Sequence, residues 1–291
     1  MAEPAGQAAI PRALDHGQGA SASRQAGPEP GRRLLAAASV AVLLFLCLPI
    51  AIVVPMSFSS ARSLEFPPPG FSLRWYTAFF GDARWLEALG TSLLVASLSS
   101  VAALLLGSLA AYGLARGSFR GRGLLEFNFL APMVVPHIIL AVAFYIVFAR
   151  IGLLGTLPGL VLGHTVLCVP YVVLVMGVAL KGFDVRLEQV AFSLGASWPV
   201  VFWRILRPSM LPSLLAAWIF AFITSFDEVT LTVFVAGTWE TIPKRMFSEL
   251  ILEVNPVITA VATLLIGFSL VSMGAIAVLM HRAGLLAPAK R

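Results

Sequence analysis

Charged side chains are scarce in this chain, and their scarcity is the first indication of its class. Asp, Glu, Lys and Arg make up only 12% of the 291 residues, about half the share that is usual in soluble globular domains. Hydrophobic residues reach 59%, and the mean hydropathy is +0.92. This composition excludes an ordinary soluble domain and predicts an integral membrane protein.

The sequence also lacks the motifs that mark most nucleotide, metal and hydrolase sites. It has no GxxxxGK[ST] loop for phosphates, no HExxH zinc motif and no GxSxG nucleophile motif. Neither the two cysteines nor the four histidines have metal-site spacing; they are Cys47, Cys168, His16, His137, His164 and His281. We therefore expect this chain to bind no cofactor or metal and to hydrolyse no ATP itself.

Long apolar runs are what the chain has instead. Residues 1–33 are polar and without periodicity, which predicts a disordered tail. A signal peptide is the alternative, but the apolar run that follows is too long for one. Six runs come next, each close to or above the roughly 20 residues that a helix needs to cross the hydrocarbon: 34–61, 88–115, 127–149, 151–180, 208–226 (continuing to Val235) and 254–281. We expect six transmembrane helices in one domain, 34–282, followed by a short cytoplasmic tail, 283–291.

Lys and Arg are spread unevenly over the segments between these runs. If the N-terminus lies inside, the inner segments hold fourteen of the twenty basic residues and the outer segments hold six. The positive-inside rule then predicts that both termini are cytoplasmic. The basic residues behind the net charge of +6 lie in the segments between the apolar runs. The charge therefore indicates a lipid bilayer rather than a nucleic acid as the partner.

The segment 181–212 is the longest after the tail that does not read as membrane-spanning, and this topology places it inside. Its apolar residues fall near helical spacing, and we expect two short helices joined by Gly195, Ala196 and Ser197. Ser197 can cap the second helix, with Pro199 at its first position. Gly195 is expected to need a positive φ or a close approach by a partner. A compact helical knob of this kind is suited to enter a groove on a soluble protein.

The same segment resembles the cytoplasmic coupling loop, or EAA loop, of ABC importer permeases. The family pattern is Glu-Ala-Ala, three residues, Gly, an apolar stretch and two prolines four residues apart. Here Gln189-Val190-Ala191 stands at Glu-Ala-Ala, Gly195 follows, and Pro208 and Pro212 end the pattern. The segments 180–186 (LKGFDVR) and 225–229 (SFDEV) resemble the spermidine/putrescine-type branch. The chain departs from the pattern at Gln189, Val190 and Arg207.

This resemblance implies a fold, partners and a set of contact residues. The fold is all-α, with six transmembrane helices of the type I importer permease and a cytoplasmic helix-turn-helix. The partners are a second permease subunit in a heterodimer, two copies of a cytoplasmic ATPase that binds ATP and Mg²⁺, and a periplasmic or extracellular substrate-binding protein. The location is the bacterial inner membrane, and the favoured cargo is a polyamine-like cation. The expected ATPase contacts are Glu188, Gln189, Ala191, Gly195, Ala196, Ser197, Phe202 and Pro208.

Asp227 and Glu228 are the sharpest anomaly in the apolar runs. Carboxylates at membrane depth are costly and usually face a cavity or a partner. Counting from Leu211 puts Asp227 about 24 Å along its helix, toward the outer side. One interpretation is a cation-attracting point on the translocation path; the other is a structural contact with another helix. Adjacent residues point about 100° apart, so the two cannot serve one spot equally, and we prefer Asp227 for the path.

The third run is interrupted by prolines. Pro132 and Pro136 free backbone carbonyls, which is tolerated where protein or a water-filled cavity satisfies them. His137 follows directly, where the polyamine-type pattern commonly has Asp. It either lines that cavity as part of the substrate path or is a hydrogen-bonded structural residue.

Two other classes of protein are weighed against the importer subunit. A stand-alone secondary transporter or channel could use Asp227 and Glu228 for ion coupling, but it would leave the knob at 181–212 without a role. Co-purification of an ATPase would separate these two. A membrane-embedded enzyme is ranked last because no nucleophile–base or metal constellation is present.

Overall fold

The computed structural model describes residues 30–252 and 255–282, so most of the predicted tails, 1–33 and 283–291, lies outside the described residues. The chain divides into two units, residues 1–49 and 50–291. Helix α1 (Pro30–Ser57) passes from the first unit into the second. The described part consists of helices joined by loops, and its only β-type pairing is one isolated bridge between Ser59 and Phe71.

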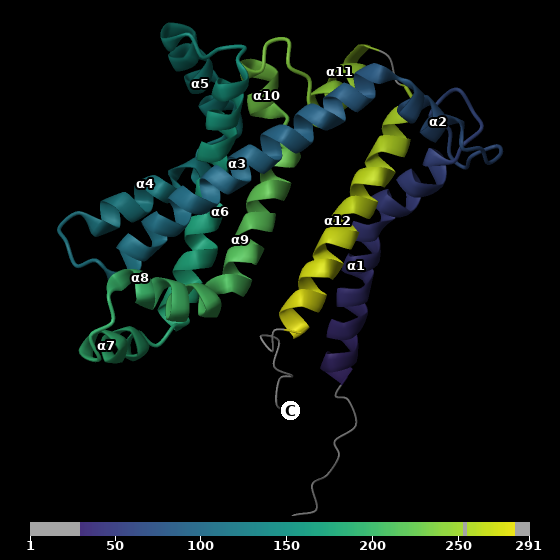
Figure 1. Cartoon of the computed structure of the whole chain (residues 1–291). Coiled ribbons are helices and arrows are strands. Elements are labelled where there is room, and N and C mark those ends of the chain that lie inside the picture. The colour runs from purple at the N-terminus through teal and green to yellow at the C-terminus, as the bar shows by residue number, and fades with distance from the viewer. Residues whose placement is uncertain (1–29, 253–254, 283–291) are drawn as a thin grey trace, which may run out of the picture. The chain divides into compact units, whose positions relative to one another are not determined.

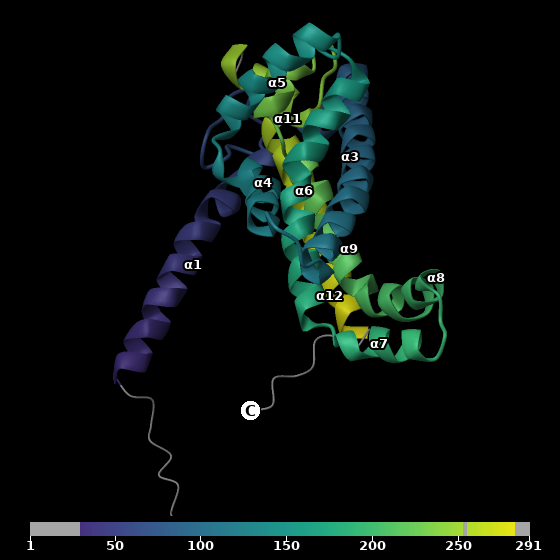
Figure 2. The same cartoon turned by 90° about the vertical axis from the view of Figure 1, so that its left-hand side faces the viewer.

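Three long helices form the core of the second unit. They are α3 (Ala83–Arg116), α6 (Leu157–Gly182) and α9 (Arg207–Phe226), which pack against one another (Figures 1 and 2). Small residues let the backbones approach closely, since Ala103 on α3 and Ala217 and Ala221 on α9 are fully buried. A Cβ added to Gly107 would lie 2.7 Å from Cβ of Val172 on α6. The close packing therefore depends on residues that contribute almost no side chain.

The number of spans agrees with the prediction, but the third span is not one straight helix. Among the described residues, five helices are long and apolar enough to cross a membrane, and a bent pair makes a sixth if counted as one. That pair is α4 (Arg122–Val134) and α5 (His137–Ile151), and the bend between them is 104°. Val135 is extended (φ −74°, ψ 131°) because the ring of Pro136 disfavours the helical region for the residue before it.

The fifth span also ends earlier than expected. The prediction of a helix continuing to Val235 is wrong, because α9 stops at Phe226 and a separate helix, α10 (Thr230–Val235), follows. Asp227 and Glu228 therefore lie in a helix break rather than inside a helix. Two helices also lie in segments predicted as outer loops, namely α2 (Arg74–Gly81) and α11 (Ile242–Leu252). The last helix is α12 (Val257–Arg282).

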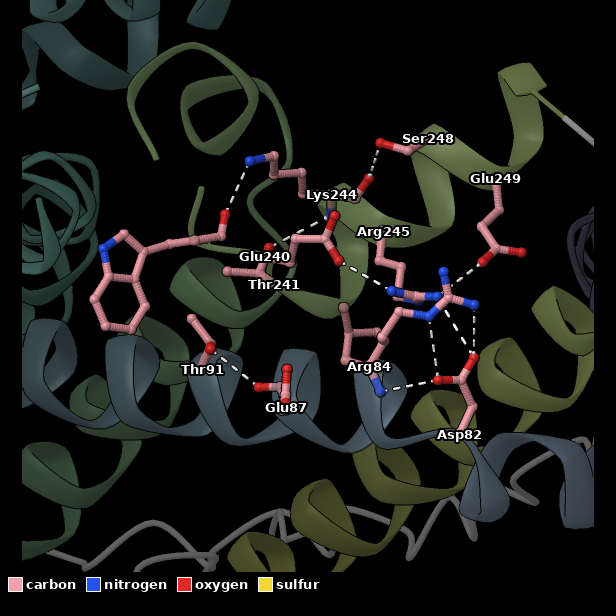
Figure 3. Close-up of polar contacts among 12 residues, drawn as sticks. Asp82, Arg84, Glu87, Thr91, Glu240, Thr241, Lys244, Arg245, Ser248 and Glu249 are labelled. Carbon is pink, nitrogen blue, oxygen red and sulfur yellow. Dashed lines mark hydrogen bonds and ion pairs between the residues drawn. The ribbon is translucent and has the colours of Figure 1, made fainter. Parts of the chain in front are cut away.

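A buried arginine ties α11 to the start of α3. Arg245, 5% exposed, reaches Glu240 at 3.0 Å, Glu249 at 3.2 Å and Asp82 at 3.7 Å (Figure 3). Its guanidinium also lies 4.7 Å from the ring centroid of Trp85. At the half-buried Asp82, hydrogen bonding to Arg84 lowers the carboxyl pKa. Two segments predicted to share the outer side, 62–87 and 236–253, thus meet at one end of α3.

Candidate functional site

The predicted coupling loop begins with a well-defined helix. Helix α7 (Val185–Ser193) starts at Asp184, whose side chain accepts a hydrogen bond from the amide of Arg186. It ends in a Schellman motif, in which the amide of Ala196 donates to the carbonyl of Ala191 and that of Gly195 to Phe192. Gly195 has φ +83°, as expected from the sequence. A Cβ added at Gly195 would have nothing within 4 Å, so the surface of the turn is open at this residue.

The second half of the loop differs from the prediction. Ser197 is the N-cap residue of α8 (Trp198–Val201), but its side chain makes no capping hydrogen bond, and Pro199 is in the second position. Helix α8 does not end as a separate short helix. It continues through a π-helical turn, Phe202–Leu206, directly into α9. Movement of α8 would therefore be transmitted to a long membrane helix without an intervening loop, whereas α7 is joined to α8 by the turn at Gly195 (Figure 1).

The expected contact residues divide into an exposed and a buried group. Three apolar residues that were not among the predicted contacts form an exposed ridge along α7 and its C-cap, with Leu187 52%, Val190 57% and Leu194 83% exposed. Ala191 lies on the opposite, buried side. Among the remaining expected contacts, Ala196 and Phe202 are half-buried, whereas Gln189, Gly195, Ser197 and Pro208 are exposed.

Glu188 points into the protein rather than toward solvent. It is 4% exposed, and Oε1 accepts a hydrogen bond of 2.7 Å from the guanidinium of Arg116, at the end of α3. Oε2 lies 3.3 Å from the hydroxyl of Tyr112, and Arg116 also donates to the carbonyl of Leu180 at 3.4 Å. The carboxylate thereby joins α7 to the end of α3, and Arg116 extends the link to the end of α6. Two segments predicted as inner, 116–126 and 181–207, thus meet at this end.

Asp227 and Glu228 point to different environments. Asp227 is exposed and lines an open pocket of about 360 Å³, together with Phe226 and with Phe268 and Ser269 of α12. The pocket adjoins a cluster of aromatic rings, in which Phe222, Phe226 and Phe268 have centroids 5.8–6.2 Å apart. A carboxylate beside aromatic faces is chemically suited to an organic cation.

Glu228 is only 7% exposed and has partners on both oxygens. Oε1 accepts a hydrogen bond of 2.8 Å from the amide of Leu231, in the first turn of α10. Oε2 lies 3.1 Å from Nδ1 of His137, whose side chain is 42% exposed. The structure therefore brings together two of the three residues predicted for the substrate path, His137 and Glu228. They join the break between α4 and α5 to the break between α9 and α10.

His164 was missed as a site residue from the sequence. It is 1% exposed, and its ring nitrogens lie 2.9 Å from the hydroxyl of Ser225 and 3.0 Å from that of Thr232. The hydroxyl of Thr232 also lies 2.8 Å from the carbonyl of Glu228. His164 thus connects α6 to both sides of the break in the fifth span. The sequence offered one signal for this site, a histidine inside an apolar run. Its partners could not be predicted because they lie 61 and 68 residues away along the chain.

Apolar spans that break beside polar side chains are the architecture of a membrane transport subunit. Residues 103–284 match the family described as the binding-protein-dependent transport system inner membrane component. The chain belongs to this family. It is a multi-pass permease subunit of an ABC importer, a transport component rather than an enzyme.

Relatives and a solved structure support the same assignment. The chain is 34% identical to the spermidine/putrescine transport system permease protein PotC of Escherichia coli K12, over 83% of this chain and 91% of PotC. It is also 34% identical to the putrescine transport system permease protein PotI of the same strain, over 77% and 82%. A chain from the crystal structure of a bacterial ABC transporter that imports alginate has the same fold, with a TM-score of 0.65 and 17% identity over 85% of this chain and 97% of that one. The expected all-α importer-permease fold and the resemblance to the polyamine-type branch are thus confirmed, whereas the cytoplasmic placement of the coupling helices stays a prediction.

Proposed function

We propose that this chain forms half of the translocation path of an ATP-driven importer for a small organic cation, a polyamine-like amine. The observation that carries the proposal is Asp227, an exposed carboxylate at the end of a membrane helix beside the rings of Phe226 and Phe268. A carboxylate there lowers the energy of a positive charge that leaves water. The names of PotC and PotI, which are polyamine permeases, point to the same class of cargo.

The rest of the importer follows from the family and from the surface of α7. We propose a heterodimer with a second permease, two copies of a cytoplasmic ATPase that carries ATP and Mg²⁺, and a substrate-binding protein on the outer side. The ridge of Leu187, Val190 and Leu194 has the i, i+3, i+7 spacing of a helix that docks in an apolar groove. Gln189, Gly195 and Ser197 flank the ridge and are available to the ATPase. Glu188 would instead hold α7 in place.

The proposed location is the bacterial inner membrane with both termini cytoplasmic. The uneven distribution of basic residues supports this orientation. The ion pair of Arg116 with Glu188 and that of Arg245 with Asp82 are consistent with it, because each joins segments assigned to one side.

The cargo is tested by uptake of radiolabelled putrescine and spermidine into cells that express the complete importer. Asp227→Asn keeps the size of the side chain and removes its charge, and we expect uptake to fall at least about tenfold, the loss of one charge-assisted contact. Assembly should be intact, because Asp227 is exposed and lies at a helix end. Ser269→Ala, in the same pocket, is the matched control and should transport normally. Unimpaired amine uptake by Asp227→Asn would contradict the proposed path.

A further inference from the structure

His137 is the exposed partner of a buried carboxylate. Its imidazole is 42% exposed and the side chain of Glu228 only 7% exposed, with 3.1 Å between Nδ1 and Oε2. The other oxygen, Oε1, is occupied by the amide of Leu231. Oε1 of Glu228 therefore has a backbone donor, and Oε2 has the imidazole at ion-pair distance. An ammonium group arriving at this point would have to displace the imidazole before it could reach the carboxylate.

We propose that His137 is a specificity-determining residue that shields Glu228 from the cargo, so that this chain offers the passing amine one free carboxylate, Asp227, instead of two. This inference rests on the proposed amine cargo. It adds that the path distinguishes amines by how many ammonium groups they carry. An amine gains a contact for its first ammonium group at Asp227. It gains no second contact from this chain while Oε2 of Glu228 is occupied.

The surroundings of the pair contain little that could replace the imidazole. His164, on α6, is buried and occupied by Ser225 and Thr232. Thr232 of α10 is directed to the carbonyl of Glu228 rather than to its carboxylate. Asp227, the neighbour in the break, is a second acid and cannot donate to a carboxylate when ionised. Within the described residues, no Lys or Arg side chain pairs with Glu228. Loss of the imidazole would thus uncover Oε2 without another side chain taking its place.

The test compares two amines that differ by one ammonium group, butylamine and putrescine. Their equilibrium binding to the purified permease–ATPase complex is measured without the binding protein, so that capture by that protein does not set the ratio. His137→Ala should raise the preference for putrescine over butylamine about tenfold, because one charge-assisted hydrogen bond becomes available. His137→Gln retains an N–H donor for Oε2 and should keep the wild-type preference.

A double variant separates shielding from a structural role of the histidine. In a Glu228→Gln background the carboxylate is gone, and His137→Ala should no longer change the preference. The inference is overturned if His137→Ala leaves the preference unchanged, or if it shifts the preference equally in both backgrounds. Failure of the proposed function has a different signature, since the wild-type complex would then bind neither amine.

Discussion

The ion pair between Arg116 and Glu188 gives the most direct test of how the helical knob is connected to the membrane helices. Glu188→Gln leaves the guanidinium of Arg116 without its carboxylate, although Arg116 keeps 21% exposure and its contact with the carbonyl of Leu180. Removing one partner of a buried pair costs about 3–5 kcal/mol, and the residual exposure favours the lower end, about 3 kcal/mol. We expect a fall of several degrees in the apparent melting temperature of the complex in detergent.

The same change should weaken coupling, because the pair fixes α7 to the end of α3. In proteoliposomes we expect the amount of cargo taken up per ATP hydrolysed to fall in Glu188→Gln and in Arg116→Met. The double variant Arg116→Met, Glu188→Leu replaces the pair with apolar side chains, which is often neutral for stability. A double-mutant cycle built from Arg116→Met, Glu188→Leu and their combination should therefore return an interaction free energy of at least about 3 kcal/mol, because each single change leaves a buried charge unpaired and the combination leaves none.

The control for a general loss of stability lies at the other end of α3. Arg245→Met breaks a buried ion-pair cluster of comparable burial and should lower the melting temperature while leaving uptake per ATP unchanged. The reasoning is refuted if the cycle gives an interaction free energy near zero. It is equally refuted if Arg245→Met uncouples uptake as strongly as Glu188→Gln.

Two further predictions concern the turn at Gly195 and the orientation of the chain. Gly195→Asp should insert normally and uncouple uptake from ATP hydrolysis, because Asp tolerates the positive φ while its side chain enters the open space where a partner would lie. Full transport by this variant would contradict a role of this turn in contacting the ATPase. In a background with Cys47 and Cys168 replaced by Ser, an impermeant thiol reagent applied from outside should label new cysteines at two exposed positions, Ser63 and Thr238, and spare those at two others, Ser118 and Ser197. The reverse pattern of labelling would overturn the assigned topology.

The spans could be predicted from sequence because a bilayer imposes a simple demand, about 20 apolar residues in helical form. Pro136 signalled the break in the third span, since the residue before a proline avoids the helical region. Helices α2 and α11 gave no such signal. They are only 8 and 11 residues long and lie in polar segments, where composition does not separate a short helix from a loop.

The partners of polar side chains were beyond prediction, because they depend on contacts across the fold. Glu188 was expected on the surface because it adjoins the coupling motif, yet its partner Arg116 lies 72 residues earlier. On a short helix, one residue of difference rotates a side chain by about 100° and separates a buried position from an exposed one. Glu188 and Val190 are two residues apart and lie on opposite faces of α7.

The break after Phe226 explains why a carboxylate occurs at this depth in an apolar span. A helix that stops there leaves backbone groups without partners, and these are expensive in a membrane. Glu228 satisfies one of them through the amide of Leu231, and Thr232 reaches the carbonyl of Glu228. His164 then links the two sides of the break. Glu228 is thus held by the backbone that the break exposes, whereas Asp227 has an exposed side chain at the pocket. Two adjacent acids that look equivalent in the sequence therefore differ in what they can offer a cation, and Asp227 is the one left free to meet it.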